Sequence, residues 1–112
     1  MRKIEQMMVG AVVVHQNWKS GNTRVEICQK DGADRYAKVY LHENLISIVD
    51  YVRMTVTLYT GGWYSNTTKS RLNALCNKRI KARDFTWYIE AEFGLQEFVN
   101  GVTIPMPLTF GA

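Results

Sequence analysis

A basic segment free of acidic residues runs from Lys69 to Arg83. It holds six of the chain's fourteen lysines and arginines, and all ten aspartates and glutamates lie outside it. The six are Lys69, Arg71, Lys78, Arg79, Lys81 and Arg83. Such a concentration of charge indicates a surface for a polyanion or an acidic partner. The competing interpretation is a solvated helix face with a basic C-terminal end, which the helix dipole favours.

Helical spacing divides the polar side chains of this segment between two flanks. Arg71 and Lys78 share one flank, while Lys69 and Asn73 lie on the other. Asn77 points outward between them, so cations and amides would share one solvent-facing surface. Such a face contacts phosphates through its cations and base edges through its amides. The residues expected at the contact are Tyr64, Lys69, Arg71, Asn73, Asn77, Lys78, Lys81 and Arg83.

Two aromatic residues precede this helix, in Gly61-Gly62-Trp63-Tyr64. Tyr64 either stacks on a base or fills a pocket of a partner, as exposed aromatic rings do in binding sites, or it has a structural role at the end of the sheet. For Trp63 the structural interpretation is favoured, in which the indole closes the end of a sheet and holds the helix. The two glycines supply backbone freedom at the turn between strand and helix.

The chain shows no catalytic signature. A nucleotide-binding P-loop needs two glycines, but Trp63 and Thr68 stand in their places. His42 and Glu43 are neighbours, so on a strand they point to opposite faces. The two cysteines have no zinc-site spacing. We therefore expect a protein that is not an enzyme and needs no cofactor or metal.

The spacing of apolar residues predicts one main amphipathic helix over about 66–79. Leu72, Leu75 and Cys76 form its buried stripe, and Ser65, Asn66 and Thr67 are all good N-cap residues. Apolar or alternating runs predict strands at 8–14, 23–28, 35–41, 53–60 and 85–91, with Phe85, Trp87 and Ile89 on one side of the last. Segment 45–52 fits a helix as well as a strand, and a short extended segment is favoured. Shorter strands are expected at 95–99 and 102–104.

These elements define a compact single α+β domain over 1–112, built on a mostly antiparallel sheet of five to seven strands. Segments 1–6 and 105–112 are expected to be loose ends. The longest apolar run, 7–14, is far shorter than the about 20 residues of a spanning helix. We therefore expect a cytoplasmic protein without a membrane partner.

The stretch from Gly62 to Ala74 resembles a recurring element of small uncharacterised phage and prophage proteins, in which a Gly-Trp turn leads into Thr-Thr-Lys-x-Arg-Leu-Asn. Segment 40–46 is similar to their Leu-His-Gly-x-x-Ile segment, with Glu43 in place of the glycine. Segments 85–88 and 98–102 are similar to their aromatic strand and glycine-containing last strand. The resemblance covers about residues 22–104. It implies a phage protein acting in an infected bacterium, and no known chemistry.

The leading hypothesis is a non-enzymatic phage accessory protein that binds nucleic acid through the basic helix. The alternative is an inhibitor of a host defence system, anti-CRISPR-like or anti-nuclease, that binds a nucleic-acid-processing protein of the host. A third hypothesis is an assembly protein that forms a homodimer, with segment 7–14 pairing edge to edge.

Overall fold

The computed structural model describes residues 1–110 of the protein. Within these residues the chain forms two α-helices, nine strands and a short 3₁₀ helix, so the strands outnumber the five to seven expected. In chain order they are α1 (Lys3–Val13), β1 (Trp18–Ser20), β2 (Thr23–Lys30), β3 (Ala33–Leu41), β4 (Asn44–Asp50), β5 (Thr55–Leu58), α2 (Asn66–Cys76), β6 (Ile80–Arg83), β7 (Thr86–Ala91), β8 (Gly94–Glu97), β9 (Val102–Pro105) and η1 (Leu108–Phe110).

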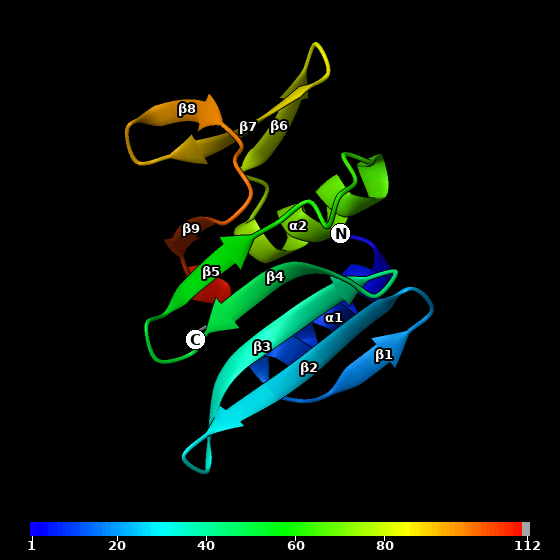
Figure 1. Ribbon diagram of the computed structural model, residues 1–112, viewed down its shortest axis with the longest axis vertical. Coiled ribbons are helices and arrows are strands. Elements are labelled where there is room, and N and C mark those ends of the chain that lie inside the picture. Colours follow the sequence, from blue (N-terminus) through cyan, green and yellow to red (C-terminus); the bar gives the residue numbers. More distant parts are fainter. Residues whose placement is uncertain (111–112) are drawn as a thin grey trace.

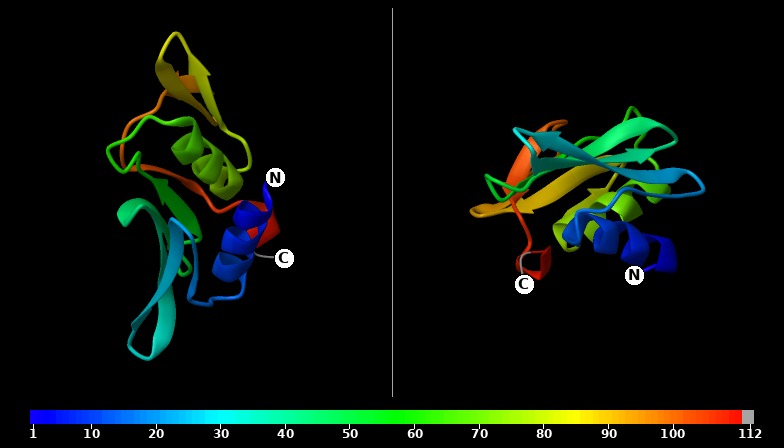
Figure 2. Two further views of the ribbon diagram at one scale, coloured as in Figure 1. Left: turned by 90° about the vertical axis from the view of Figure 1, so that its right-hand side faces the viewer. Right: turned by 90° about the horizontal axis from the view of Figure 1, so that it is seen from below.

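The strands form two antiparallel sheets. The larger sheet has the order β1-β2-β3-β4-β5-β9, and the smaller has the order β6-β7-β8. Helices α1 and α2 lie side by side against one face of the larger sheet, whose other face is left uncovered (Figures 1 and 2). The smaller sheet lies beyond α2, at one end of the long axis (Figure 1). This compact α+β domain confirms the predicted fold class.

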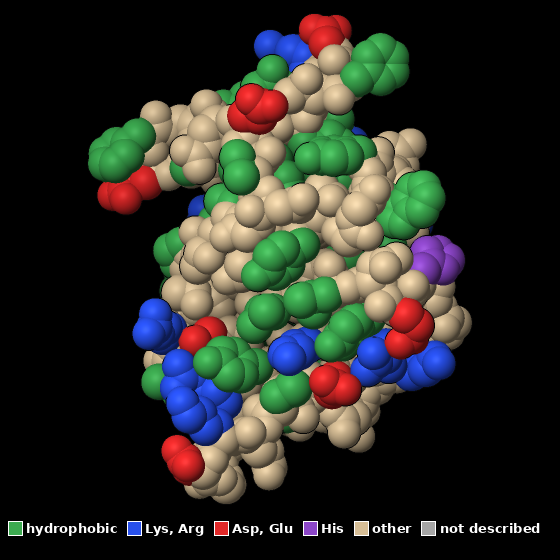
Figure 3. Space-filling view, in the orientation of Figure 1, with side chains coloured by type: hydrophobic (Ala, Val, Ile, Leu, Met, Phe, Trp, Pro, Cys, Tyr) green, Lys and Arg blue, Asp and Glu red, His purple; other side chains and the backbone are tan. Residues whose placement is uncertain are grey.

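The alternating sequence pattern separates a buried and an open face of the larger sheet. On β3, Ala37 and Val39 are fully buried toward the helices, whereas Tyr36, Lys38 and Tyr40 remain partly exposed. Hydrophobic and charged side chains share the open face (Figure 3). The strand predicted at 53–60 is present as the shorter β5, and the ambiguous segment 45–52 is the strand β4.

Segment 8–14 was predicted to be a strand, and that prediction is wrong, because its residues belong to the helix α1. Met8, Ala11 and Val12 recur at helical spacing and are buried against the sheet. The helix ends in a Schellman motif, with Gln16 N donating to Ala11 O at 2.9 Å and His15 in the left-handed conformation (φ 57°). Burial of this stripe outweighs the strand preference of the valines, since each buried Met or Val contributes about 1.5–3 kcal/mol.

The ends of the chain also take part in regular structure. Residues 3–6 form the first turn of α1, and Glu5 is 3% exposed. At the other end η1 brings Phe110 into the core. The last two residues of the segment 105–112, expected to be loose, lie outside the described residues.

Helix α2 begins at the predicted cap. The hydroxyl of Ser65 accepts a hydrogen bond from Thr68 N at 3.1 Å, and Leu72, Leu75 and Cys76 are fully buried, as predicted. The helix ends at Cys76, about three residues earlier than expected, because Asn77 takes the left-handed conformation (φ 59°). Lys78 therefore lies just beyond the helix and not on its last turn.

The turn between β3 and β4 explains how Glu43 replaces a glycine. His42 and Glu43 both have positive φ, 51° and 62°, as a two-residue type I′ turn requires. Contacts hold both residues in this unfavourable conformation. Glu43 pairs with Arg24 at 3.0 Å, and the backbone N–H of His42 donates to Asn22 O at 2.8 Å.

Candidate functional site

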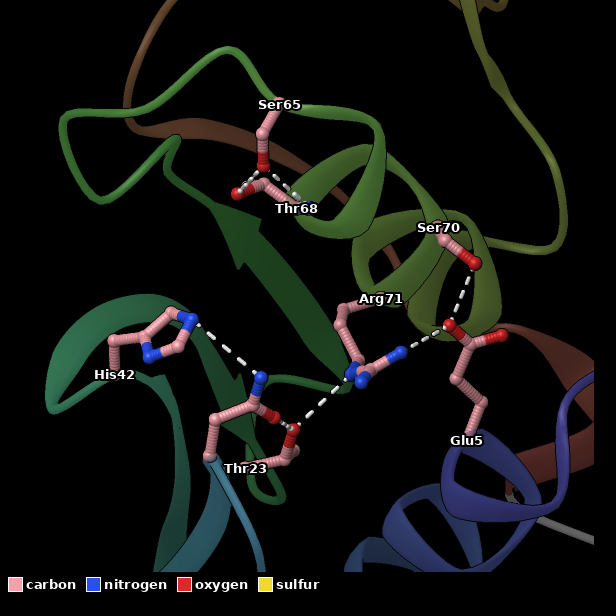
Figure 4. A network of polar contacts seen from close by, with 8 residues as sticks. Glu5, Thr23, His42, Ser65, Thr68, Ser70 and Arg71 are labelled. Carbon is pink, nitrogen blue, oxygen red and sulfur yellow. Dashed lines mark hydrogen bonds and ion pairs between the residues drawn. The ribbon is translucent and has the colours of Figure 1, made fainter.

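Arg71, expected on the solvent-facing side of α2, is buried, with 4% of its surface exposed. Its Nη1 donates to Glu5 Oε2 at 2.7 Å, and its Nε donates to Thr23 Oγ1 at 3.1 Å (Figure 4). Ser70 Oγ donates to the same Glu5 oxygen at 2.6 Å. Arg71 therefore joins α1, α2 and β2 and does not reach a ligand. The prediction failed because it treated α2 as one-sided, whereas the sheet and α1 cover two sides of it.

The Glu5–Arg71 pair adds no net charge to the surface above it. Burial alone would raise the pKa of the Glu5 carboxyl. The hydrogen bonds from Ser70 and Arg71, together with the charge of Arg71, outweigh burial and hold this pKa below its ordinary value of 4.5. Glu5 is thus ionised at neutral pH, and its charge is neutralised by Arg71.

Asn73 also has a structural role and not the expected contact with base edges. Its Oδ1 accepts from Ile80 N at 2.8 Å, and its Nδ2 donates to Ile80 O at 3.1 Å. The amide thereby imitates a strand partner for Ile80 and fixes the point where β6 leaves α2. Few of its hydrogen-bonding atoms are left for a ligand.

A groove of about 420 Å³ runs along α2 beside the N-terminal end of α1. Three cationic side chains line it, Arg2 from the start of α1, Lys69 from α2 and Lys78 just beyond α2. Glu5, neutralised by Arg71, is the one acid among the lining residues. The amides of Asn66 and Asn77 lie along the same groove. The structure thus brings three of the predicted contact residues, Lys69, Asn77 and Lys78, to one groove and adds Arg2.

The remaining predicted residues lie outside this groove. Lys81 and Arg83 are exposed on β6, at one edge of the smaller sheet. Lys81 Nζ is 3.6 Å from Glu90 Oε1, but both side chains are more than half exposed, so this ion pair is weak. Tyr64 is 60% exposed and packs edge-on against Trp87, with ring centroids 4.9 Å apart.

Trp63 does not close the end of the sheet as expected, because 66% of its surface is exposed. It lines a second cavity of about 510 Å³ with His42, Asn44 and Thr67. His42 lies in the turn after β3, where its ring contacts Asn22 at 3.4 Å (Figure 4). Within residues 1–110, no three His, Cys, Asp or Glu side chains are grouped to hold a metal ion.

Arg2 was not among the predicted contact residues, because the segment after it was interpreted as a strand. The signal was present, since Ile4, Met8 and Val12 recur every four residues. A helical interpretation places Arg2 at the helix start. The contact between α1 and α2 includes the buried pair of Glu5 and Arg71, which lie 66 residues apart in the sequence. No local sequence pattern predicts this contact.

The fold and the groove define a small α+β domain with a cationic surface between two helices. The profile of the Kyanoviridae Gp96 protein family matches residues 1–105, so the chain belongs to this family of phage proteins. The match agrees with the phage origin that the resemblance implied, and it also covers α1. Neither curated proteins nor solved structures gave a match. No helix within the described part of the chain is long and apolar enough to cross a membrane.

Proposed function

We propose that this phage protein binds nucleic acid along the groove between α1 and α2 and acts without catalysing a reaction. The observation that carries this proposal is the set of three cations, Arg2, Lys69 and Lys78, around a groove whose one acid is neutralised. Cationic side chains that follow one groove neutralise successive phosphates, and this supplies most of the affinity in binding without sequence preference.

The cationic path continues beyond the groove. Lys78 is followed by Lys81 and Arg83 on β6, so five exposed or partly exposed cations extend from α1 to the smaller sheet. The groove amides of Asn66 and Asn77 would add hydrogen bonds to phosphate or sugar. We infer from this proposal that the protein acts in the cytoplasm of the infected bacterium, where phage and host nucleic acids are found.

The structure bears differently on the two alternative hypotheses. Segment 7–14 is helical and its apolar side chains are partly buried in the core, so the edge-to-edge strand pairing proposed for a homodimer is not available to it. An inhibitor of a host nuclease would use the same cationic groove for an acidic protein surface. The two hypotheses therefore differ in the ligand that occupies the groove, which is nucleic acid in one and an acidic protein surface in the other.

The test is fluorescence anisotropy with a labelled 20-nucleotide single strand and with a duplex of the same sequence, at low salt. Lys69→Glu/Lys78→Glu reverses two charges at the groove and should weaken binding more than tenfold. Lys19→Glu/Lys30→Glu is the matched control, because it makes the same charge change at exposed positions on β1 and β2. No binding by the wild type, or an equal loss in the control, would contradict the proposal.

A further inference from the structure

Phe85 lies at the tip of the β6–β7 hairpin and is 106% exposed, so no described residue packs against its ring. The hairpin is closed by Asp84 and Phe85, between the paired residues Arg83 and Thr86. Both loop residues have positive φ, 51° and 65°, which makes this a type I′ turn. Hydrophobic side chains project at the ends of the smaller sheet (Figure 3).

This is an unfavourable place for a phenylalanine. The second loop position of a type I′ turn prefers glycine, because a bulky side chain in the left-handed region is strained. The β2–β3 hairpin follows the rule with Asp31-Gly32. The β3–β4 turn departs from it, but there Arg24 pairs with Glu43 and compensates. At Phe85 no contact offsets either the strain or the exposure of an aromatic ring, and uncompensated departures of this kind mark functional positions.

The ring stands at the basic edge of the smaller sheet. Lys81 and Arg83 lie on the same strand, which is an edge strand. The other edge, formed by β8, carries Glu97 and follows the turn that contains Glu92. A second phenylalanine, Phe93, lies in that turn and is 96% exposed, but its φ is not positive. Each ring follows an acidic residue in its turn, Asp84 or Glu92. The two rings therefore share exposure and differ in strain and in the charge of the adjoining edge strand.

We propose that Phe85 stacks on a nucleobase of a single strand whose backbone follows the groove and the basic edge of β6. This proposal rests on the proposed function and adds the part of the ligand that the ring contacts. Strand β6 rises by about 10 Å from Ile80 to Arg83, at about 3.3 Å per residue, and Phe85 lies in the turn at its far end.

The two-residue turn fixes the backbone that carries the ring. A short loop closed by paired strands has little backbone freedom, so the side-chain torsions of Phe85 are the main part that has to be ordered on binding. An aromatic face at the end of a cationic path is the arrangement that single-strand binding surfaces use, because every base has a face to stack on. The strained backbone conformation of Phe85 is then the energetic cost of presenting the ring at the tip of the hairpin.

The test compares Phe85→Gly with Phe93→Gly, using a labelled 20-nucleotide oligothymidylate. Loss of one stacking contact should weaken binding of Phe85→Gly by about 5- to 150-fold. The slope of affinity against salt should stay unchanged, because no charge is removed. Phe93→Gly should bind within about twofold of the wild type. Glycine relieves the positive φ, so the melting temperature of Phe85→Gly should not fall; Phe85→Asn, which also tolerates this φ, serves as a second variant.

The outcomes separate this inference from the proposed function. If the wild type binds and both Phe85 variants bind equally well, the stacking role is wrong while groove binding stands. If Phe93→Gly loses as much affinity as Phe85→Gly, the basic edge has no special part and the inference is also wrong. If the wild type binds the duplex but not the single strand, the stacking role is wrong while groove binding stands; if it binds neither, both proposals are wrong.

Discussion

Replacing Arg71 with methionine should destabilise the protein strongly, although Arg71 belongs to a basic segment that resembles an open surface. The change leaves the carboxylate of Glu5 buried without its cation and removes the bond to Thr23. Breaking a buried ion pair from one side costs about 3–5 kcal/mol. For a chain of this length each kcal/mol corresponds to about 4 °C in melting temperature. The melting temperature should therefore fall by roughly 12–20 °C.

Urea unfolding measures the loss in free energy of unfolding, and thermal unfolding measures the fall in melting temperature, both followed by tryptophan fluorescence. Lys78→Met is the matched control. Lys78 is exposed, so its loss should change stability by less than about 0.5 kcal/mol. The double variant Glu5→Met/Arg71→Met should recover most of the loss, because two apolar residues replace the pair. If Arg71→Met costs no more than Lys78→Met, the buried pair does not join the helices and the shape of the groove is wrong.

Three further predictions concern the surroundings of the groove. The pKa of Glu5 is lower in the folded protein than in the unfolded chain, so the stability it contributes is complete above about pH 4.5 and is lost as the pH falls through the folded pKa; Glu5→Gln should lack this part of the acid transition in a pH series of urea midpoints. Asn73→Ala removes both hydrogen bonds to Ile80 and should cost about 1–3 kcal/mol, with faster amide exchange at Ile80; unchanged exchange would show that the bonds do not hold β6. Ser65→Ala removes the cap on α2 and should cost about 1 kcal/mol in thermal unfolding, whereas Ser65→Asp should cost nearly nothing.

The α+β class and most of the strands follow from local patterns. Period-2 alternation located β2, β3 and β7, and the three candidate caps Ser65, Asn66 and Thr67 located the start of α2, where Ser65 is the cap. These signals are local, because each strand shows a buried and an open face in its own residues. The helix α1 was missed where two local signals conflicted, since its valines favour a strand and its spacing favours a helix.

The candidate site was only partly predictable. Lys69 and Lys78 line the groove, whereas Arg71 and Asn73 looked equally suited from the sequence and have structural roles. Nothing in the spacing around Arg71 distinguishes it, because its partner Glu5 lies 66 residues earlier. An arginine on a helix flank is buried only if another element covers that flank, and this is decided by tertiary packing.

Phe85 shows the opposite kind of error. Alternation placed Phe85 on the same side of a strand as Trp87 and Ile89, but those two residues are buried whereas Phe85 lies exposed in the turn before β7. The strand begins one residue later, because the register of β6 with β7 leaves Asp84 and Phe85 as the loop. A residue just outside a strand can continue the alternation of that strand and still have no neighbouring element to pack against.

The salt dependence of binding tests the central claim most directly. Five cations, Arg2, Lys69, Lys78, Lys81 and Arg83, predict a log–log slope of about −3.5 for a single strand. Neutralising two of them in Lys69→Met/Lys78→Met should reduce the slope to about −2. The account predicts both values for the labelled 20-nucleotide strand between 50 and about 200 mM salt. A flat response of the wild type, or a slope that the double variant leaves unchanged, would contradict it.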